Sequence, residues 1–184
     1  MSTDNQTIIS TQSEQQNEQP SFKRWLKHSF YLKRSKYLFN QLQQDKIAAA
    51  ITDAEDGHRG EIQVIIEASL PSDCAYRYST LKRAQYLFGK YGVWDTERNS
   101  GLLIYLNLCE HQVEIVADRG INRAVNETCW NEICQTMLPY FKQGDFTEGL
   151  CIGIQALGEA LQDFYRDDLH DQDGNELSNL PRLL

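Results

Sequence analysis

The sequence lacks the long apolar run that a membrane-spanning helix needs, because nowhere do about 18 apolar residues follow one another. Its first twenty residues contain five glutamines and three carboxylates but no lysine or arginine, which is unlike a secretory signal peptide. The five cysteines are an odd number without a C-x-x-C pair, so they indicate no disulfide framework. We therefore expect a cytoplasmic protein whose free thiols pack as small hydrophobic side chains.

Several motifs of catalysis and nucleotide binding are missing as well. The sequence contains no G-x-x-x-x-G-K-[ST] loop, no G-x-G-x-x-G after the first expected strand, no G-x-S-x-G elbow and no H-E-x-x-H. The histidines are too scattered for their spacing to indicate a metal site; they are His28, His58, His111 and His170. These absences disfavour nucleotide-driven chemistry and the common hydrolase mechanisms.

What is present is typical of a globular protein. The length of 184 residues corresponds to about one domain with tails. The composition is 41% hydrophobic and 24% charged, which is far from that of disordered or coiled-coil proteins. The formal net charge of -8 repels polyanions, so we predict no nucleic-acid partner.

The N-terminal part changes character at residue 22. Residues 1–21 carry little apolar surface and are predicted to be a disordered polar tail. Residues 22–44 interleave positive and aromatic side chains, which indicates a basic aromatic helical segment. This segment could dock its aromatic face on the domain or on a protein partner, or lie peripherally on an anionic membrane at the inner membrane face. The side chains expected to make this contact are Lys23, Arg24, Trp25, Lys27, Lys33 and Arg34.

Hydrophobic periodicity predicts one domain over residues 45–168, followed by a C-terminal tail at 169–184 that lies across the surface. Pro139 is expected to kink or truncate its helix. Helices are predicted at 45–55, 74–91, 130–141 and 146–164, the last two as an αα hairpin. Strands are predicted at 62–70, 102–108 and 112–118. This order indicates an α/β fold, a three-layer α/β/α sandwich with helices on both faces of a small central sheet.

Polar residues gather where the expected strands begin or end. Carboxylates at these positions could hold a hard divalent cation, Ca²⁺ or Mg²⁺, and arginines could neutralise phosphoryl oxygens. The metal ligands predicted in this way are Glu61, Asp95 and Asp118. The predicted phosphate or ligand site consists of Arg98, Asn99 and Arg119, with Asn99 orienting the substrate. The alternative is that these residues shape turns and pair across strands.

Four stretches of sequence, in this order and spacing, resemble the TPM domain family. They are G-E-I at 60–62, R-N-S-G-L-L-I-Y-L at 98–106, V-E-I-V-A-D-R-G-I at 113–121 and F-K-Q-G-D-F-T-E-G-L at 141–150. The resemblance covers about residues 48–164 and implies a single α/β/α sandwich. Where the family commonly has Gly-x-Gly-Leu-Glu, this chain has D-R-G-I-N at 118–122, and it looks like a short bacterial branch without signal peptide or membrane span.

The resemblance implies two classes of function. The family includes a thylakoid lumen protein of photosystem II repair with acid phosphatase activity and an auxiliary protein of an acetylcholine receptor. The favoured hypothesis is a non-catalytic binding or scaffold module, linked to the maintenance of membrane or envelope proteins. The alternative is a divalent-cation-dependent acid phosphatase that uses the carboxylates and arginines at the strand ends.

Overall fold

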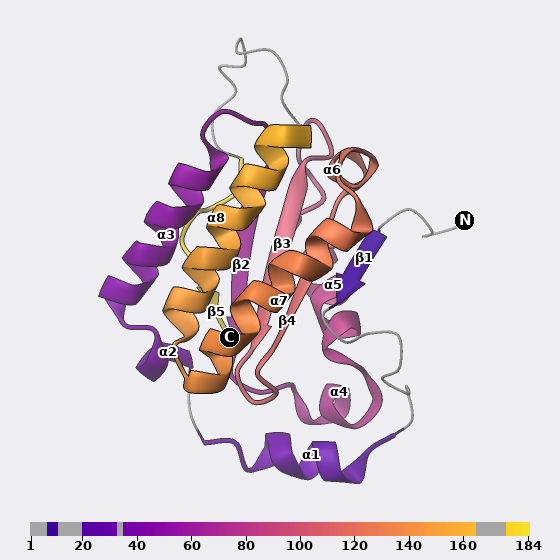
Figure 1. Ribbon diagram of the computed structural model, residues 1–184. Coiled ribbons are helices and arrows are strands. Elements are labelled where there is room, and N and C mark those ends of the chain that lie inside the picture. The colour runs from indigo at the N-terminus through magenta and orange to yellow at the C-terminus, as the bar shows by residue number, and fades with distance from the viewer. Residues whose placement is uncertain (1–6, 11–19, 33–34, 165–175) are drawn as a thin grey trace, which may run out of the picture.

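The computed structural model describes residues 7–10, 20–32, 35–164 and 176–184. Within these residues the strands form a five-stranded sheet in the order β1-β4-β3-β2-β5 (Figure 1). β2 runs parallel to β3 and β5, whereas β4 runs antiparallel to β3 and β1. The strands are β1 (Thr7–Ser10), β2 (Glu61–Glu67), β3 (Gly101–Asn107), β4 (Gln112–Ala117) and β5 (Arg182–Leu183).

Helices cover both faces of this sheet, which confirms the predicted α/β/α sandwich. α3, α7 and α8 cover the face that Figure 1 shows in front, and α5 packs on the back face against β3 and β4. α1 lies at the foot of the molecule beside α4. The helices are α1 (Phe22–Ser29), α2 (Ser35–Leu38), α3 (Gln41–Glu55), α4 (Ser72–Arg77), α5 (Thr80–Lys90), α6 (Arg119–Ala124), α7 (Glu127–Gln143) and α8 (Phe146–Phe164).

The front layer is the larger hydrophobic core. Every second residue of β2, β3 and β4 points into it, because successive side chains of a strand point to opposite faces. α8 lies between α3 and α7 and packs on both. The α7–α8 turn closes at Gly144, whose φ of 88° favours glycine, so the predicted αα hairpin is confirmed. The fully buried strand residues of this core include Ile62, Val64, Ile66, Leu102, Ile104, Leu106 and Val113.

The back layer is smaller and mixes apolar with polar residues. Its apolar part joins strand residues such as Leu103 to Leu87 and Phe88 of α5. The same face of the strands also buries several polar side chains, which an apolar core excludes unless they are paired. These are Gln63, Glu67, Asn107 and Glu114.

Both ends of the described chain differ from the expectations. Residues 7–10, expected within the disordered tail of 1–21, pair with β4 as an edge strand; the four residues read T-I-I-S, a short β-branched run. The C-terminal residues, expected on the surface, add β5 to the other edge, where the Leu184 N–H donates to the Ile66 carbonyl at 2.9 Å. Of these two tails the structure describes residues 7–10, 20–21 and 176–184. The other tail residues lie outside the described residues.

Two expected helices also differ in the structure. The helix expected over 74–91 is divided into α4 and α5, because Ser79 caps the second helix by accepting from the Lys82 N–H. Truncation at Pro139 is wrong, since α7 continues through it to Gln143. The expected segment 22–44 contains α1, α2 and the start of α3, which begins at Gln41 behind an Asn40 capping box.

Candidate functional site

The predicted polar residues at the strand ends lie around Gly101, at one end of the sheet. Glu61 is paired with Gly101 across the parallel β2–β3 ladder. On the other side, the Asp118 N–H donates to the Gly101 carbonyl at 2.9 Å, and the Gly120 N–H donates to the Asn99 carbonyl at 3.0 Å. We call Glu61, Asp95, Arg98, Asn99, Asp118 and Arg119 the strand-end cluster.

Asp118 is the most buried member of the strand-end cluster, with 4% of its surface exposed. It is the N-cap of α6, a helix that periodicity did not predict, and its Oδ1 accepts from the Arg119 N–H at 2.6 Å. Its Oδ2 is buried and makes no hydrogen bond to the described residues. Capping thus accounts for one oxygen of this carboxylate, and the other oxygen is buried without a hydrogen-bond partner among the described residues.

Asn99 and Arg119 meet beside this cap. Asn99 has a φ of 55°, in the left-handed region, which a turn commonly assigns to asparagine. The Arg119 Nη2 donates to the Asn99 Oδ1 at 3.2 Å. Arg98 and Asp95 are exposed on the preceding loop. The structure therefore brings Asn99, Asp118 and Arg119 together and places Asp95 and Arg98 at the surface.

Glu61 is covered by the C-terminal segment, which sequence reasoning did not place here. The Leu177 N–H donates to the Glu61 Oε2 at 3.2 Å. Both oxygens of Glu176 accept from the Glu97 N–H, at 3.1 and 3.3 Å. The segment at 176–177 therefore ties β2 to the loop before β3.

Glu55 lies beside Glu61 and was also missed. Its Oε1 accepts from the Ile62 N–H at 2.7 Å. Burial, followed by the nearby charge of Glu61, raises the pKa of Glu55 to about 7 in spite of this hydrogen bond. Burial likewise raises the pKa of Glu61. At neutral pH these neighbouring carboxyl groups therefore share an environment that disfavours charge.

The geometry does not assemble the expected cation site. Among the described residues, no group of three or more His, Cys, Asp and Glu side chains is placed so that it could hold a metal ion. The unpaired Oδ2 of Asp118 is one suitable ligand. Glu61, however, already accepts a hydrogen bond from the Leu177 N–H. The Arg119 guanidinium beside Asn99 adds a positive charge that would repel a cation. The residues present do not fit a three-carboxylate site, and the divalent cation stays a prediction.

The predicted contact segment is docked through its polar residues. The Arg24 Nε lies 2.5 Å from the Glu110 Oε1, and its Nη1 donates to the Tyr78 carbonyl. The His28 Nδ1 accepts from the Leu70 N–H at 3.0 Å, so its Nε2 is the nitrogen that donates to Glu110, at 2.6 Å. Burial opposes the charge of Glu110, but the hydrogen bonds from His28 and Arg24 outweigh it and lower its pKa. The Arg24 side chain thus binds other parts of the same chain.

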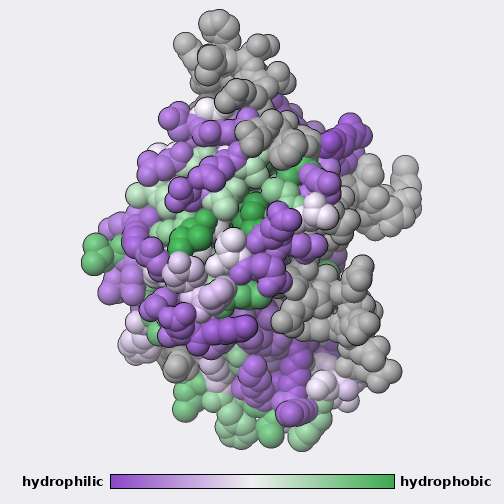
Figure 2. Space-filling model, viewed as in Figure 1, coloured by the Kyte–Doolittle hydropathy of each residue, from purple (hydrophilic) through white to green (hydrophobic). Residues whose placement is uncertain are grey.

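Two apolar side chains of α1, and that of its C-cap residue Phe30, are exposed, whereas Trp25 is half-buried. Phe22, Leu26 and Phe30, spaced four residues apart, are 66%, 41% and 73% exposed, whereas His28 is buried. Figure 2 shows hydrophobic side chains at the foot of the molecule, where α1 lies. Lys23 and Lys27 are exposed beside them, and Trp25 stacks on Phe22 with the ring centroids 5.2 Å apart. Lys33 and Arg34, also predicted to make this contact, lie outside the described residues.

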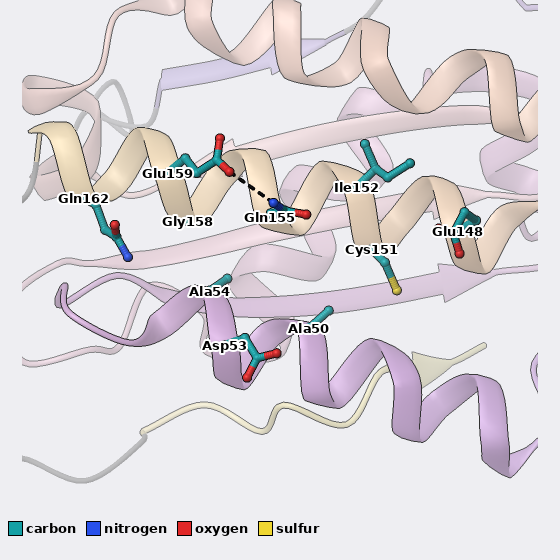
Figure 3. A pocket seen from close by; sticks show the side chains of 10 residues that line it. All are labelled: Ala50, Asp53, Ala54, Glu148, Cys151, Ile152, Gln155, Gly158, Glu159 and Gln162. Carbon is teal, nitrogen blue, oxygen red and sulfur yellow. Dashed lines mark hydrogen bonds between the residues drawn. The ribbon is translucent and has the colours of Figure 1, made fainter.

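A hollow of about 440 Å³ lies on the front, between α3 and α8 (Figure 3). Small side chains form its floor, because Gly158 of α8 approaches Ala54 so closely that an added Cβ would lie 2.9 Å from the Ala54 Cα. Carboxylates on its rim are bonded within the chain: Glu159 accepts from the Gln155 Nε2 at 3.1 Å, and Glu148 from the Lys46 Nζ at 2.5 Å. The hollow therefore follows from the small side chains at the contact between α3 and α8.

The cysteines are free thiols. Burial raises the pKa of all five, and it does so most for Cys134, which lies in the front core. A raised pKa lowers the fraction of reactive thiolate, so these side chains behave as packing groups.

Comparison with known families completes the description of the site. The model of the TPM domain matches residues 33–160, from the residues before α2 to the last turns of α8. The chain belongs to the TPM domain family. This TPM domain includes the strand-end cluster within the matched residues, whereas α1 precedes them.

Solved structures agree with this assignment. The BA42 protein of the psychrophilic bacterium Bizionia argentinensis, solved by NMR, is 29% identical and superposes with a TM-score of 0.68, over 78% of this chain and 94% of that one. The N-terminal domain of a protein from P. gingivalis shares the fold at 20% identity and a TM-score of 0.59, over 74% and 85%. Comparison with curated proteins gives no match. Within the described ranges, every helix is too short or too polar to span a bilayer.

Proposed function

We propose that this TPM domain is a non-catalytic binding module that attaches to an anionic membrane surface through α1, on the cytoplasmic face, and serves the maintenance of membrane proteins. The observation that carries the proposal is the orientation of α1. A surface helix of a globular protein ordinarily turns its apolar stripe toward the core. α1 instead turns Arg24 and His28 inward and Phe22, Leu26 and Phe30 outward.

Burial of apolar surface within the chain does not explain this orientation. Burying a Leu or Phe side chain is worth about 1.5–3 kcal/mol, and α1 forgoes most of this gain at Phe22 and at its C-cap residue Phe30, and part of it at Leu26. Arg24 and His28 hold the helix in this orientation through Glu110, which follows β3 in the turn to β4. These polar contacts on the inner side of α1 therefore keep its apolar stripe on the outer side.

The charges beside the stripe favour an anionic lipid surface as the occupant. The whole chain carries a net charge of -8, yet Lys23 and Lys27 border the exposed stripe. Each lysine near an anionic surface contributes about 1 kcal/mol, and aromatic side chains such as Phe22 and Trp25 suit the headgroup boundary. Two turns of helix give reversible attachment, as expected of a peripheral contact.

The strand-end cluster supports the non-catalytic part of the proposal. Glu61 is bonded to the Leu177 N–H, and Asp118 caps α6. Arg119 is bonded to Asn99. Each of these residues thus has a contact that organises this end of the sheet.

Vesicle sedimentation tests the proposal with the full chain. Vesicles of phosphatidylcholine with phosphatidylglycerol are expected to sediment the protein, vesicles of phosphatidylcholine alone much less, and salt should weaken the binding. The variant Phe22→Ser/Leu26→Gln/Phe30→Ser should bind at least about tenfold more weakly. Leu42→Gln is the matched control, because Leu42 is 77% exposed but lies on α3.

Two results would overturn the proposal. One is a parent protein that stays in solution with both kinds of vesicle. The other is a triple variant that sediments as well as the parent and the Leu42→Gln control.

A further inference from the structure

A second hollow lies on the back layer and is unlike the one on the front. It has a volume of about 650 Å³, within the range of small-molecule sites. A neighbouring hollow reaches Phe22 and Trp25 of α1, and the two share Asp73 and Tyr78. The side chains that line the 650 Å³ hollow come from α4, α5 and the turn between them, and they include Cys74, Tyr78, Lys82, Arg83, Gln85 and Tyr86.

Arg83 is held in place by a buried carboxylate. Its Nε donates to the Glu67 Oε2 at 3.0 Å and its Nη2 to the Glu67 Oε1 at 2.6 Å, a two-point contact that fixes the plane of the guanidinium. The Tyr105 hydroxyl donates to the same Glu67 Oε2 at 2.7 Å and accepts from the Asn107 Nδ2 at 3.1 Å. Nη1 is the nitrogen of Arg83 that Glu67 does not engage.

This network orients Arg83 more than it stabilises the fold. A buried ion pair gains little over apolar side chains of similar volume, because both charges lose their hydration. Burial opposes the charge of Arg83, but its hydrogen bonds and attraction to Glu67 raise its pKa, and burial raises the pKa of Tyr105. At neutral pH both groups keep their protons, so Arg83 stays charged in its ion pair with Glu67 and keeps its remaining N–H groups as donors at the hollow.

The rest of the lining adds a second cation and two aromatic rings. The Lys82 Nζ lies 5.9 Å from the centroid of the Tyr78 ring, and the Arg83 Cζ lies 5.4 Å from that of Tyr86. The lining contains one carboxylate, Asp73, against these two cations. Glu67 balances the charge of Arg83, so what the hollow offers an anion is an oriented guanidinium and an ammonium group beside two aromatic rings.

We propose that this hollow is a binding site for a phosphate monoester, with the phosphate on Arg83 and Lys82 and its organic group against Tyr78 and Tyr86. A doubly charged phosphate can accept from two N–H groups of one guanidinium, so it suits a guanidinium that is already oriented, since less ordering is needed on binding. The ester could be a free small molecule or the headgroup of a lipid such as phosphatidic acid. The site does not depend on the proposed function of α1, although the neighbouring hollow touches that helix.

Titration of the full chain with phenyl phosphate and with inorganic phosphate, followed by calorimetry and by amide NMR shifts, tests the site. Phenyl phosphate should bind more tightly than inorganic phosphate and shift residues of α4 and α5. Lys82→Gln should weaken phenyl phosphate at least tenfold. Lys90→Gln is the matched control, because Lys90 lies on the same helix, near the rings of Tyr91 and Tyr86, and does not line the hollow.

Arg83 needs a variant that spares the fold. Removing it alone would leave Glu67 buried without a partner, so Glu67→Gln/Arg83→Gln replaces both charges and keeps groups that can hydrogen-bond. This double variant, verified as folded by its NMR spectrum, should lose phenyl phosphate binding at least tenfold. Absence of binding by the parent, or equal binding by Lys82→Gln and Lys90→Gln, would overturn the proposal.

Two further experiments distinguish a lipid phosphate from a free phosphate ester, and this proposal from the membrane attachment proposed for α1. Tighter binding to phosphatidic acid vesicles than to phosphatidylglycerol vesicles, lost in Lys82→Gln, identifies a lipid headgroup; binding of phenyl phosphate without this preference identifies a free ester. The triple variant of α1 should still bind phenyl phosphate. If α1 does not attach to membranes, phenyl phosphate should still bind the hollow. If phenyl phosphate does not bind, the vesicle sedimentation expected for α1 is unaffected.

Discussion

The two faces of the sheet bury different kinds of side chain. Toward α3, α7 and α8 the strands present aliphatic residues that meet aliphatic and aromatic ones. Toward α5 the same strands present Glu67, Asn107 and Glu114 beside Leu103, and the partners of the buried carboxylates include Arg83 and the Thr80 hydroxyl. One sheet therefore has a dry core in front and a hydrogen-bonded layer behind.

The difference indicates how stability and recognition are divided. Apolar burial stabilises a fold by roughly 25 cal/mol per Å² and tolerates exchanges of similar volume. A hydrogen-bonded layer gains less, but it sets the positions of particular groups. In this chain the polar layer orients Arg83 beneath the second hollow, and through Glu110 it extends to Arg24 and His28 of α1.

Gly101 is the position where the back layer has least room, and Gly101→Ala should have the largest effect. An added Cβ would lie 1.7 Å from the backbone oxygen of Val93, so the loop before β3 would have to move. We expect a loss of more than about 4 kcal/mol in the free energy of unfolding, or no folded protein. Urea denaturation followed by circular dichroism measures this loss.

Gly89→Ala is the control for Gly101→Ala. Gly89 lies within α5, and a Cβ there would meet nothing within 4 Å. Alanine at this position should raise stability by about 0.5–1 kcal/mol, because glycine is the weaker helix former. If both variants unfold at the same urea concentration, the back layer is looser than its geometry indicates.

The dry front core was predictable from the sequence, because its signal is periodic. Apolar residues at helical or strand spacing located α3, β2, β3, β4, α7 and α8 within a few residues. Short elements escaped this signal, since one or two turns cannot show a period. Their marks were capping residues instead: Asp118 before α6, and Ser79, which separates the short α4 from α5.

The polar layer was predictable only in part. Asn99, Asp118 and Arg119 could be placed together because they end or begin neighbouring strands. The carboxylate Glu67, in an otherwise apolar strand, was a visible signal of a buried partner, but the sequence does not say that Arg83 is that partner. The outward stripe of α1 depends on Glu110, which is 82 residues from His28, so local pattern could not show its direction.

Glu55 is a polar exception at the edge of the front layer, and Glu55→Gln should have an intermediate effect. Its pKa rises from the ordinary 4.5 to about 7 on folding, so between these pH values the folded state binds more protons than the unfolded state. The parent should therefore lose stability as pH rises from about 5 to about 7, by roughly 2 kcal/mol, and change little above that. The variant, which keeps an oxygen for the Ile62 N–H, should lack this loss.

Urea denaturation at pH 5 and pH 8 measures the difference between Glu55→Gln and the parent. The variant should be the more stable of the two at pH 8, and the gap should close toward pH 5. Asp53→Asn is a suitable control, because Asp53 is an exposed carboxylate on the same helix. A parent whose stability stays level or rises between pH 5 and pH 7, with the Glu55→Gln variant following the same curve, would contradict the assignment to Glu55.

The smallest effect on stability is expected for the outward face of α1. Phe22→Ser/Leu26→Gln/Phe30→Ser removes three large apolar side chains. Phe22 and Phe30 are mostly exposed, so each of these two changes should alter the free energy of unfolding by no more than about 0.5 kcal/mol, and the change at the half-buried Leu26 by no more than about 1 kcal/mol. Leu157→Ala, a single change in α8 at a fully buried position, should cost about 2–5 kcal/mol. Urea denaturation of both variants compares them directly. A triple variant as unstable as Leu157→Ala would mean that the stripe packs against the protein itself, whereas a stable triple variant that no longer sediments with anionic vesicles separates recognition by α1 from the stability of the front core.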